Sequence, residues 1–296
     1  MNVTYHVNTF NRIHLLKNLL ISFEKCNVYE PFEWVITDFG STDGTREFLL
    51  EYSSKNKWAT VLLSNEKDYF DFLKLRDLHP RNKKQIIATI FGKAINVARS
   101  VSKGDMFVHV ADDHQFFRKC DWISEMSSVI DHRLKNTGAD DISSILYRGL
   151  SYSRIMKQNN ETFPEDTTSS GVKYFVAKHK CYDDYHLMTS SMFNRIGNYF
   201  EIDKEKDEKI LGAWRNGEYS RDHYTDYLVR TKEMNLRKVF MKFPCAIDFP
   251  NYAHKKLNVE RNELIIPIID NEKIYSMFGN LDRPVSTDEI FQISGM

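Results

Sequence analysis

The chain has few cysteines, and they lie far apart in the sequence. Only Cys26, Cys120, Cys181 and Cys245 occur among 296 residues, and no two of them form a CxxC pair. A cysteine-built zinc site or a dithiol redox motif is therefore not expected. We expect four reduced thiols, most of them buried.

An excess of either charge is also absent. The chain has 41 Lys plus Arg and 41 Asp plus Glu residues, so its formal net charge is zero. No overall field would attract nucleic acid or an acidic membrane surface, although local patches of charge remain compatible with this sum. Hydrophobic residues make up 42% of the chain, which supports a packed core and argues against long disorder.

Long apolar runs are missing as well. No segment approaches the roughly 20 apolar residues that a membrane-spanning helix needs. The first residues, MNVTYHVNTF, have neither the basic region nor the apolar core of a signal peptide. From the sequence we expect no transmembrane segment and a cytoplasmic location.

The first 115 residues alternate between strand-like and helix-like segments. Short β-prone runs alternate with segments whose apolar residues recur every three or four positions. This alternation predicts an α/β fold with parallel strands, which binds ligands at the carboxyl ends of those strands. The expected strands are 3–7, 34–37, 60–63 and 106–110, and the expected helices follow Asn11, start near Thr45 and cover 86–101.

The pattern is less regular after residue 115. We expect helices over 122–134 and 222–234, strands over 144–147 and 239–243, and a polar loop over 159–171. Earlier in the chain, the polar segment 69–84 predicts an inserted loop or short helix. The tail from residue 255 has mixed patterning and is compatible with a lid, an arm or an interface.

Polar residues cluster where the second expected strand ends, in the sequence ITDFGSTDGT. Asp38 ends the strand, where its carboxylate could accept hydrogen bonds from a ribose or a base edge. Gly40 and Gly44 allow positive φ angles and a close approach of the backbone to a ligand. Asn11 is expected to cap the first helix and Asp43 the second.

Two adjacent carboxylates, Asp112 and Asp113, follow the fourth expected strand. Such a pair is electrostatically unfavourable unless a cation neutralises it. A hard divalent ion, Mg²⁺ or Mn²⁺, prefers oxygen ligands and could bridge to a diphosphate. Adjacent aspartates are also common in turns and helix caps, which is the alternative. We expect Asp113 to lie on a surface-exposed loop.

The order of these elements resembles glycosyltransferase family 2 and its relatives with the A-type fold. The matching stretches are VTYHVNTFNR, EWVITDFGSTDGTREFL and GKAINVARSVSKGDMFVHVADDH, all within residues 1–115. The resemblance implies a Rossmann-like nucleotide-diphospho-sugar transferase fold, with a mixed, mostly parallel sheet and flanking helices. It also implies a nucleotide-sugar-binding half over 1–115, an acceptor-binding and catalytic half over 116–254 and a C-terminal extension over 255–296.

The resemblance gives roles to single residues. Those implied to bind the nucleotide or the donor sugar are Thr9, Asn11, Arg12, Asp38 and Asp112, and the implied metal ligand is Asp113. The chain departs from the family pattern at Asn8, where Pro is usual, and at Phe39 and Ala111, where acidic residues are usual.

The C-terminal half matches the family more weakly. RDHYTDYLVR resembles a helix start that carries the base of inverting members, which implies Asp226 as catalytic base, with Asp222 as the alternative. Asp226 could instead form a surface ion pair with Arg230, four residues later. His254 stands where some members have a histidine that completes the metal site; a purely structural histidine is the alternative.

The resemblance thus implies a metal-dependent glycosyltransferase of the hexosyltransferase type. It would use Mn²⁺ or Mg²⁺ to move a sugar from a nucleotide-diphospho-sugar, with a UDP-sugar favoured, to an acceptor hydroxyl with inversion. The acceptor could be a carbohydrate, a lipid-linked molecule or a modified nucleobase. The alternatives are a catalytically inactive carbohydrate- or nucleotide-binding protein and a nucleotidyltransferase, which should carry a glycine-rich loop after its first strand.

Overall fold

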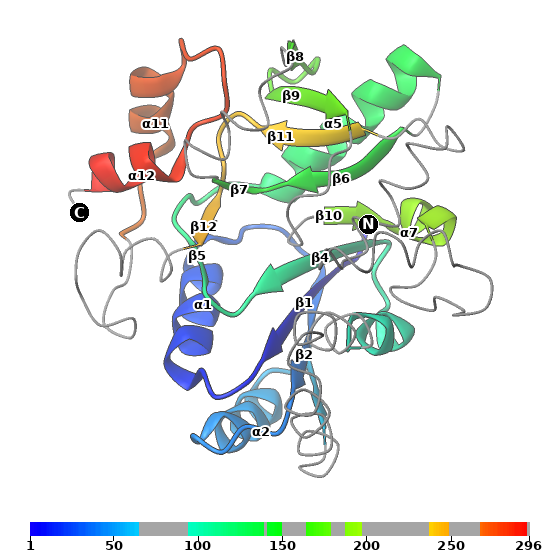
Figure 1. Ribbon diagram of the computed structural model, residues 1–296, viewed down its shortest axis with the longest axis vertical. Coiled ribbons are helices and arrows are strands. Elements are labelled where there is room, and N and C mark those ends of the chain that lie inside the picture. Colours follow the sequence, from blue (N-terminus) through cyan, green and yellow to red (C-terminus); the bar gives the residue numbers. More distant parts are fainter. Residues whose placement is uncertain are drawn as a thin grey trace, which may run out of the picture.

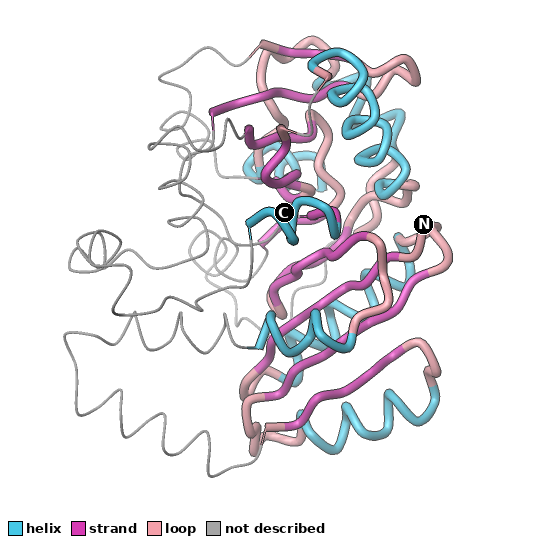
Figure 2. Tube along the Cα trace, turned by 90° about the vertical axis from the view of Figure 1, so that its right-hand side faces the viewer, coloured by secondary structure: helices cyan, strands magenta, loops and turns pink. Residues whose placement is uncertain are grey.

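The strands of the protein form one large and one small sheet. The computed structural model describes residues 1–64, 94–138, 141–149, 164–178, 187–196, 237–248 and 267–294. A nine-stranded mixed sheet has the order β3-β2-β1-β4-β10-β6-β11-β9-β8, and a three-stranded sheet has the order β5-β12-β7. Helices pack against the large sheet (Figures 1 and 2). The predicted fold class, an α/β fold with a mixed sheet and flanking helices, is confirmed.

The first four strands of the large sheet run parallel to one another. Because the chain goes from β1 to β2 on one side and returns to β4 on the other, the carboxyl ends of β1 and β4 form a topological switch point. Sheets of this kind bind ligands at such a point. The elements of this half are β1 (Val3–Thr9), α1 (Ile13–Cys26), β2 (Phe32–Asp38), α2 (Thr45–Lys55), β3 (Ala59–Leu63), a helix over 94–101 and β4 (Met106–Ala111).

The second half adds strands in both directions. β10 pairs antiparallel with both β4 and β6, so β6 and its parallel neighbour β11 have the same direction as β4. The elements of this half are β5 (His114–Phe116), α5 (Trp122–Thr137), β6 (Ile142–Leu146), β7 (Arg148–Gly149), β8 (Glu165–Thr167), β9 (Lys173–Lys178), β10 (Leu187–Thr189), α7 (Ser190–Ile196), β11 (Arg237–Met241), β12 (Ala246–Asp248), α11 (Asn271–Phe278) and α12 (Thr287–Ser294).

One secondary-structure prediction for this half is wrong. β8 lies inside the segment 159–171, for which the sequence predicts a loop. Its residues are polar, but they pair with β9 at the edge of the large sheet, and this tertiary pairing overrides their composition. The segments 69–84 and 222–234 lie outside the described residues, and the helix predicted over 86–101 is described only from residue 94.

The small sheet continues three strands of the large one. β5 follows β4, β7 follows β6, and β12 follows β11. Asp112 and Asp113 are the only two residues between β4 and β5. The paired carboxylates therefore lie where the two sheets meet.

The two faces of β1 differ in polarity. Val3, Tyr5 and Val7 belong to the main hydrophobic core, where Tyr5 and Phe23 of α1 have ring centroids 4.6 Å apart. His6 points to the opposite face, as do Thr4 and Asn8, and all three are buried. In Figure 1, α1 and the 94–101 helix lie on opposite sides of β1 and β4. Parallel sheets are usually apolar on both faces, so this buried polar face is a departure.

His6 and its neighbour on β4, His109, form a stacked pair on that polar face. Their Nδ1 atoms are 3.1 Å apart, and the His6 Nε2 atom lies 3.3 Å from Thr37 Oγ1. Burial, followed by the nearby His109, lowers the pKa of His6 well below its ordinary value. His6 is therefore neutral near pH 7, which allows one ring nitrogen to donate and the other to accept.

The described end of the chain packs on the small sheet. α11 and α12 contribute Ile274, Ile290 and Phe291 to a second hydrophobic cluster that includes Ile247 of β12. Arg118 is 1% exposed and donates a hydrogen bond to the hydroxyl of Tyr275 at 3.0 Å. Residues 267–294 are thus joined to the body by both apolar and polar contacts, while 255–266 lie outside the described residues.

Three of the four cysteines lie among the described residues, and none of the three forms a disulfide. Cys26 and Cys245 are buried, and Cys120 is half-buried. Burial raises the pKa of the Cys26 thiol to about 11 and that of Cys120 to about 12. For these three, the predicted buried thiols are present; Cys181 lies outside the described residues. Across the described helices, none is long and apolar enough to cross a membrane.

Gly104 stands where the sheet leaves no room for a side chain. A Cβ at this position would lie 2.6 Å from the backbone nitrogen of Thr4 and 2.8 Å from the carbonyl oxygen of Met106. Both atoms belong to the paired backbones of β1 and β4, so they cannot move aside without disturbing the sheet. We expect Gly104→Ala to lower the free energy of unfolding by about 1–3 kcal/mol, measured by urea unfolding. A variant as stable as the original chain would contradict this packing.

Candidate functional site

The candidate site is built around two carboxylates and a guanidinium at the switch point. The Nη1 atom of Arg12, just before α1, lies 2.8 Å from Asp112 Oδ1 and 3.6 Å from Asp113 Oδ2. Thr9 Oγ1, at the end of β1, donates a hydrogen bond to Asp112 Oδ2 at 3.1 Å. Four of the residues implied by the resemblance are therefore in contact around one point.

Both carboxylates are more buried than expected. The side chains of Asp112 and Asp113 are 8% and 12% exposed, so the expectation of a surface-exposed loop for Asp113 is wrong. The reason is that these residues join two sheets rather than forming a projecting loop. Burial raises the pKa of Asp112, against the opposing effect of Arg12.

The charge around Asp113 is unfavourable for its ionised form. Burial, then Asp248 and Asp112, raise the pKa of Asp113 to about 7, and Arg12 and Arg148 oppose this rise only in part. Carboxylate oxygens with too little positive charge around them suit a hard divalent cation, which prefers oxygen ligands. The carboxylates of Asp112 and Asp113 therefore fit the metal that the resemblance implies.

Asp248 and Arg148 are neighbours of the site that sequence reasoning missed. Asp248 is the last residue of β12 and pairs in register with His114, directly after Asp113. Arg148 begins β7, which pairs with the other side of β12. Each is a single charged residue in an irregular part of the sequence, so no local signal marks it. Only the pairing of β5, β12 and β7 brings them to Asp113.

Asn8, where the family pattern has Pro, is also at the switch point. It lies on β1 between Thr37 of β2 and Ala111 of β4, and it is 6% exposed. Its amide is close enough to influence the pKa of His6, yet neither its nitrogen nor its oxygen makes a hydrogen bond to any described residue. The residue that replaces the usual Pro is therefore a buried polar group at the switch point.

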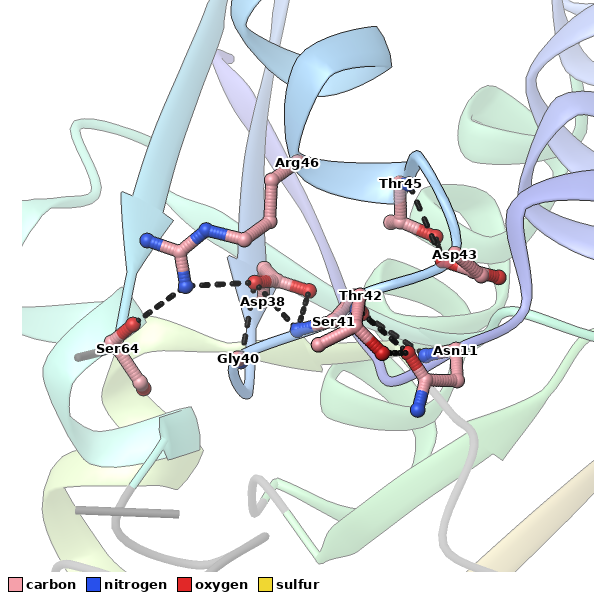
Figure 3. A network of polar contacts seen from close by, with 9 residues as sticks. All are labelled: Asn11, Asp38, Gly40, Ser41, Thr42, Asp43, Thr45, Arg46 and Ser64. Carbon is pink, nitrogen blue, oxygen red and sulfur yellow. Dashed lines mark hydrogen bonds and ion pairs between the residues drawn. The ribbon is translucent and has the colours of Figure 1, made fainter. Parts of the chain in front are cut away.

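Asp38 organises the turn that follows β2 (Figure 3). Its side chain is fully buried, and its carboxylate accepts hydrogen bonds from the backbone N–H groups of Gly40, at 3.0 Å, and Ser41, at 3.1 Å. Arg46 Nη1 lies 3.4 Å from the same carboxylate and donates to the carbonyl oxygen of Ser64 at 2.8 Å. Gly40 has a φ of 89°, which the tight turn requires. Asp38 therefore shapes the loop, and its contact with a nucleotide stays a prediction.

Asn11 joins the first loop to this turn instead of capping α1. Its φ is +48°, and its Oδ1 accepts a hydrogen bond from the backbone of Thr42 at 2.7 Å. The predicted cap is wrong because α1 begins after Arg12, without a side-chain cap bond from that residue. Asparagine adopts this left-handed conformation more readily than most residues, which turns its side chain toward the neighbouring loop.

Asp43 serves the first turns of two helices. Its Oδ2 accepts a hydrogen bond from the N–H of Ile13 in α1, and its Oδ1 accepts one from the N–H of Thr45 in α2, each at 3.1 Å. The sequence predicts only the second of these contacts. Together with Asn11, Asp43 fixes the loops after β1 and β2 to each other, which gives the candidate site a rigid rim.

Replacing Asp38 with Asn tests its role in the turn. Asparagine loses the negative charge that strengthens the bonds to two N–H groups and to Arg46. We expect the free energy of unfolding to fall by about 1–3 kcal/mol, and nucleotide affinity to fall with it because the rim loosens. Urea unfolding and calorimetric titration with a nucleoside diphosphate measure the two effects. Unchanged stability would exclude the turn role, and unchanged affinity would exclude the nucleotide role.

Three other residues implied by the resemblance, Asp222, Asp226 and His254, lie outside the described residues. Within the described ranges, no group of three or more His, Cys, Asp or Glu side chains is arranged to hold a metal ion. The roles of these three residues therefore stay predictions.

Comparisons with known proteins give likenesses in structure alone. No family model and no curated protein matches the chain. Among solved structures, residues 1–349 of Staphylococcus aureus TarS superpose with a TM-score of 0.47 at 16% identity, over 86% of this chain and 64% of that one. The same fragment in complex with UDP-GlcNAc gives 0.35 at 21% identity, over 56% and 40%.

A third likeness is to the mannosyltransferase PcManGT from Pyrobaculum calidifontis in complex with GDP-Man and Mn²⁺. Its TM-score is 0.40 at 14% identity, over 67% of this chain and 47% of that one. The chain thus spans less than two thirds of the length of each of these structures.

The described fold is compatible with the α/β fold that the resemblance of the sequence implies. The order β3-β2-β1-β4, the mixed remainder of the sheet and the paired carboxylates directly after β4 agree with it. The activity proposed below rests on the side chains at the switch point and not on the likenesses to solved structures.

Proposed function

We propose that the chain is a glycosyltransferase. It moves a sugar from a nucleotide-diphospho-sugar, a UDP-sugar being favoured, to an acceptor hydroxyl, with the help of Mn²⁺ or Mg²⁺. The observation that carries this proposal is the contact between Arg12, Thr9 and the buried carboxylates Asp112 and Asp113 at the switch point of the sheet. A site with both signs of charge suits a donor that brings a diphosphate and a divalent cation together.

Each residue of the site has a proposed task. Asp113 would hold the metal, with His254 as a further ligand, and Asp112 would hold the ribose or the sugar of the donor; the metal would stabilise negative charge on the departing diphosphate. Arg12, whose side chain is 43% exposed, is placed to reach a phosphate group.

The acceptor side depends on residues outside the described ranges. Asp226, or Asp222 in its place, would remove the proton from the acceptor hydroxyl as that oxygen attacks the anomeric carbon. Attack on the face opposite the diphosphate inverts the configuration. A carbohydrate, a lipid-linked acceptor or a modified nucleobase is compatible with this chemistry.

The proposal is tested by incubating the protein with a panel of nucleotide-sugars. We expect release of nucleoside diphosphate from one of them, with Mn²⁺ or Mg²⁺ present and not with chelator. Asp113→Ala provides the inactive control. Phe39 and Ala111, which replace acidic residues, favour an inactive binding protein as the second candidate. Affinity by calorimetry without any turnover would support that candidate, and release of inorganic pyrophosphate would indicate a nucleotidyltransferase.

A further inference from the structure

Arg12 holds the position in which a cation would neutralise both carboxylates. A single nitrogen, Nη1, is 2.8 Å from Asp112 and 3.6 Å from Asp113, and so lies between the two side chains. A divalent ion bound by carboxylate oxygens lies about 2.0–2.6 Å from them. Such an ion and Nη1 would then be close neighbours with charges of the same sign. The guanidinium and the ion cannot both occupy this place.

The surroundings allow the side chain of Arg12 to leave while the backbone stays. Its side chain is 43% exposed, whereas Asp112 and Asp113 are 8% and 12% exposed. On one side Asn11 is tied to the turn after β2, through Thr42, and on the other the N–H of Ile13 is tied to Asp43. Both neighbours are therefore held by hydrogen bonds, so a change in the position of the guanidinium would involve the long side chain of Arg12 and not its backbone.

We propose that Arg12 is an exchangeable internal cation. Without donor its guanidinium lies against Asp112 and Asp113 and offsets part of their negative charge; when the donor arrives with its divalent cation, Arg12 releases the carboxylates and moves its guanidinium to the diphosphate. Only the second half of this inference, the move of the guanidinium to the diphosphate, rests on the proposed function. The exchange explains why the arginine that contacts the buried carboxylates has a side chain that is 43% exposed to solvent: the same charge serves the empty and the loaded site.

The first half of the proposal predicts competition between Arg12 and the metal. We expect Arg12→Gln to bind Mn²⁺ about tenfold more tightly than the original chain in the absence of nucleotide. The free Mn²⁺ concentration is followed by electron paramagnetic resonance during titration. Lys17→Gln is the matched control: it removes one positive charge from α1, the helix that follows Arg12, where the ammonium lies 5.0 Å from the Phe48 ring centroid. Its Mn²⁺ affinity should equal that of the original chain.

Arg12→Lys keeps a charge but not the planar guanidinium, so we expect an intermediate gain in Mn²⁺ affinity, about threefold. This variant decides the question if Arg12→Gln does not fold. Unchanged or weaker Mn²⁺ binding in the folded variants, or no Mn²⁺ binding in any of them, overturns the proposal.

The second half predicts the opposite effect on the nucleotide. In saturating Mn²⁺, Arg12→Gln should bind UDP about tenfold more weakly than the original chain, because the guanidinium no longer reaches the diphosphate. Unchanged UDP affinity overturns this transfer of the guanidinium. Sugar transfer with unchanged Mn²⁺ affinity in Arg12→Gln would reject the exchange and keep the proposed function. Tighter Mn²⁺ binding by Arg12→Gln, with no turnover of any nucleotide-sugar by the original chain, would support the exchange with the metal and reject the proposed function.

Discussion

Asp113→Asn is expected to stabilise the metal-free protein and to abolish sugar transfer. Asparagine has the size of aspartate but no charge, so it removes the unfavourable ionisation of a buried carboxyl beside Asp248 and Asp112. It also removes the ionised oxygens that would hold the divalent cation. The metal's stabilisation of charge is worth several kcal/mol, so we expect turnover to fall by roughly three orders of magnitude.

The stabilising effect has a defined pH window. The pKa of Asp113 is raised from 3.8 to about 7 in the folded protein. Between these values the unfolded chain has released the proton and the folded protein still holds it, so stability falls as pH rises, by about 1.4 kcal/mol per pH unit. The decrease in the free energy of unfolding is complete above pH 7, and well below pH 4 there is no decrease. Asp113→Asn has no such dependence.

Urea unfolding in chelator at pH 5, 6, 7 and 8 measures this difference. The advantage of Asp113→Asn over the original chain should grow from pH 5 to pH 7 and then level off. Asp131→Asn, which changes an exposed aspartate on α5, is the control and should leave the difference near zero at every pH. A constant difference, or a variant less stable than the original chain at pH 8, would show that Asp113 is not held in an unfavourable environment.

The parallel half of the fold could be predicted because its signals are local. Each of β1, β2, β3 and β4 is a short β-prone run, and α1 and α2 have apolar residues at helical spacing, so a window of fifteen residues identifies each. The closeness of Thr9 and Asp112 agrees with this pattern, because Thr9 ends β1 and Asp112 directly follows its parallel neighbour β4.

The remainder of the candidate site depends on contacts between distant segments. Asp248 reaches Asp113 only through the pairing of β12 with β5, across more than a hundred residues. Asp38 was predicted at the right place, yet its bonds to the turn and to Arg46 need the three-dimensional path of the loop. Likewise, the sequence places Asn11 after the first strand, but it does not predict that Asn11 contacts the loop after β2. Spacing along the chain indicates which edge of the sheet a residue occupies and not which partner it finds there.

The second large effect is expected at Asp226, the proposed base. Asp226 and Asp222 lie outside the described residues, so this prediction rests on the sequence, which predicts a helix over 222–234.

The flanking aromatic residues Tyr224 and Tyr227 favour a base in this predicted helix. An apolar wall would withdraw a carboxylate from water and raise its pKa, which makes it a better proton acceptor near neutral pH. Asp226 is preferred because Leu228 and Arg230 follow it, as in the stretch that it resembles. Asp222, one helical turn earlier, would face the same side.

Asp226→Asn should lower turnover by about 10²–10⁴ and leave donor binding intact, because a base acts on the acceptor and not on the nucleotide. Turnover is measured as nucleoside diphosphate release with acceptor present, and donor affinity by calorimetry. Asp222→Asn is the matched variant: a large loss there with normal turnover in Asp226→Asn would assign the base to Asp222. Normal turnover in both would reject this helix as the source of the base and would favour a reaction that retains the anomeric configuration.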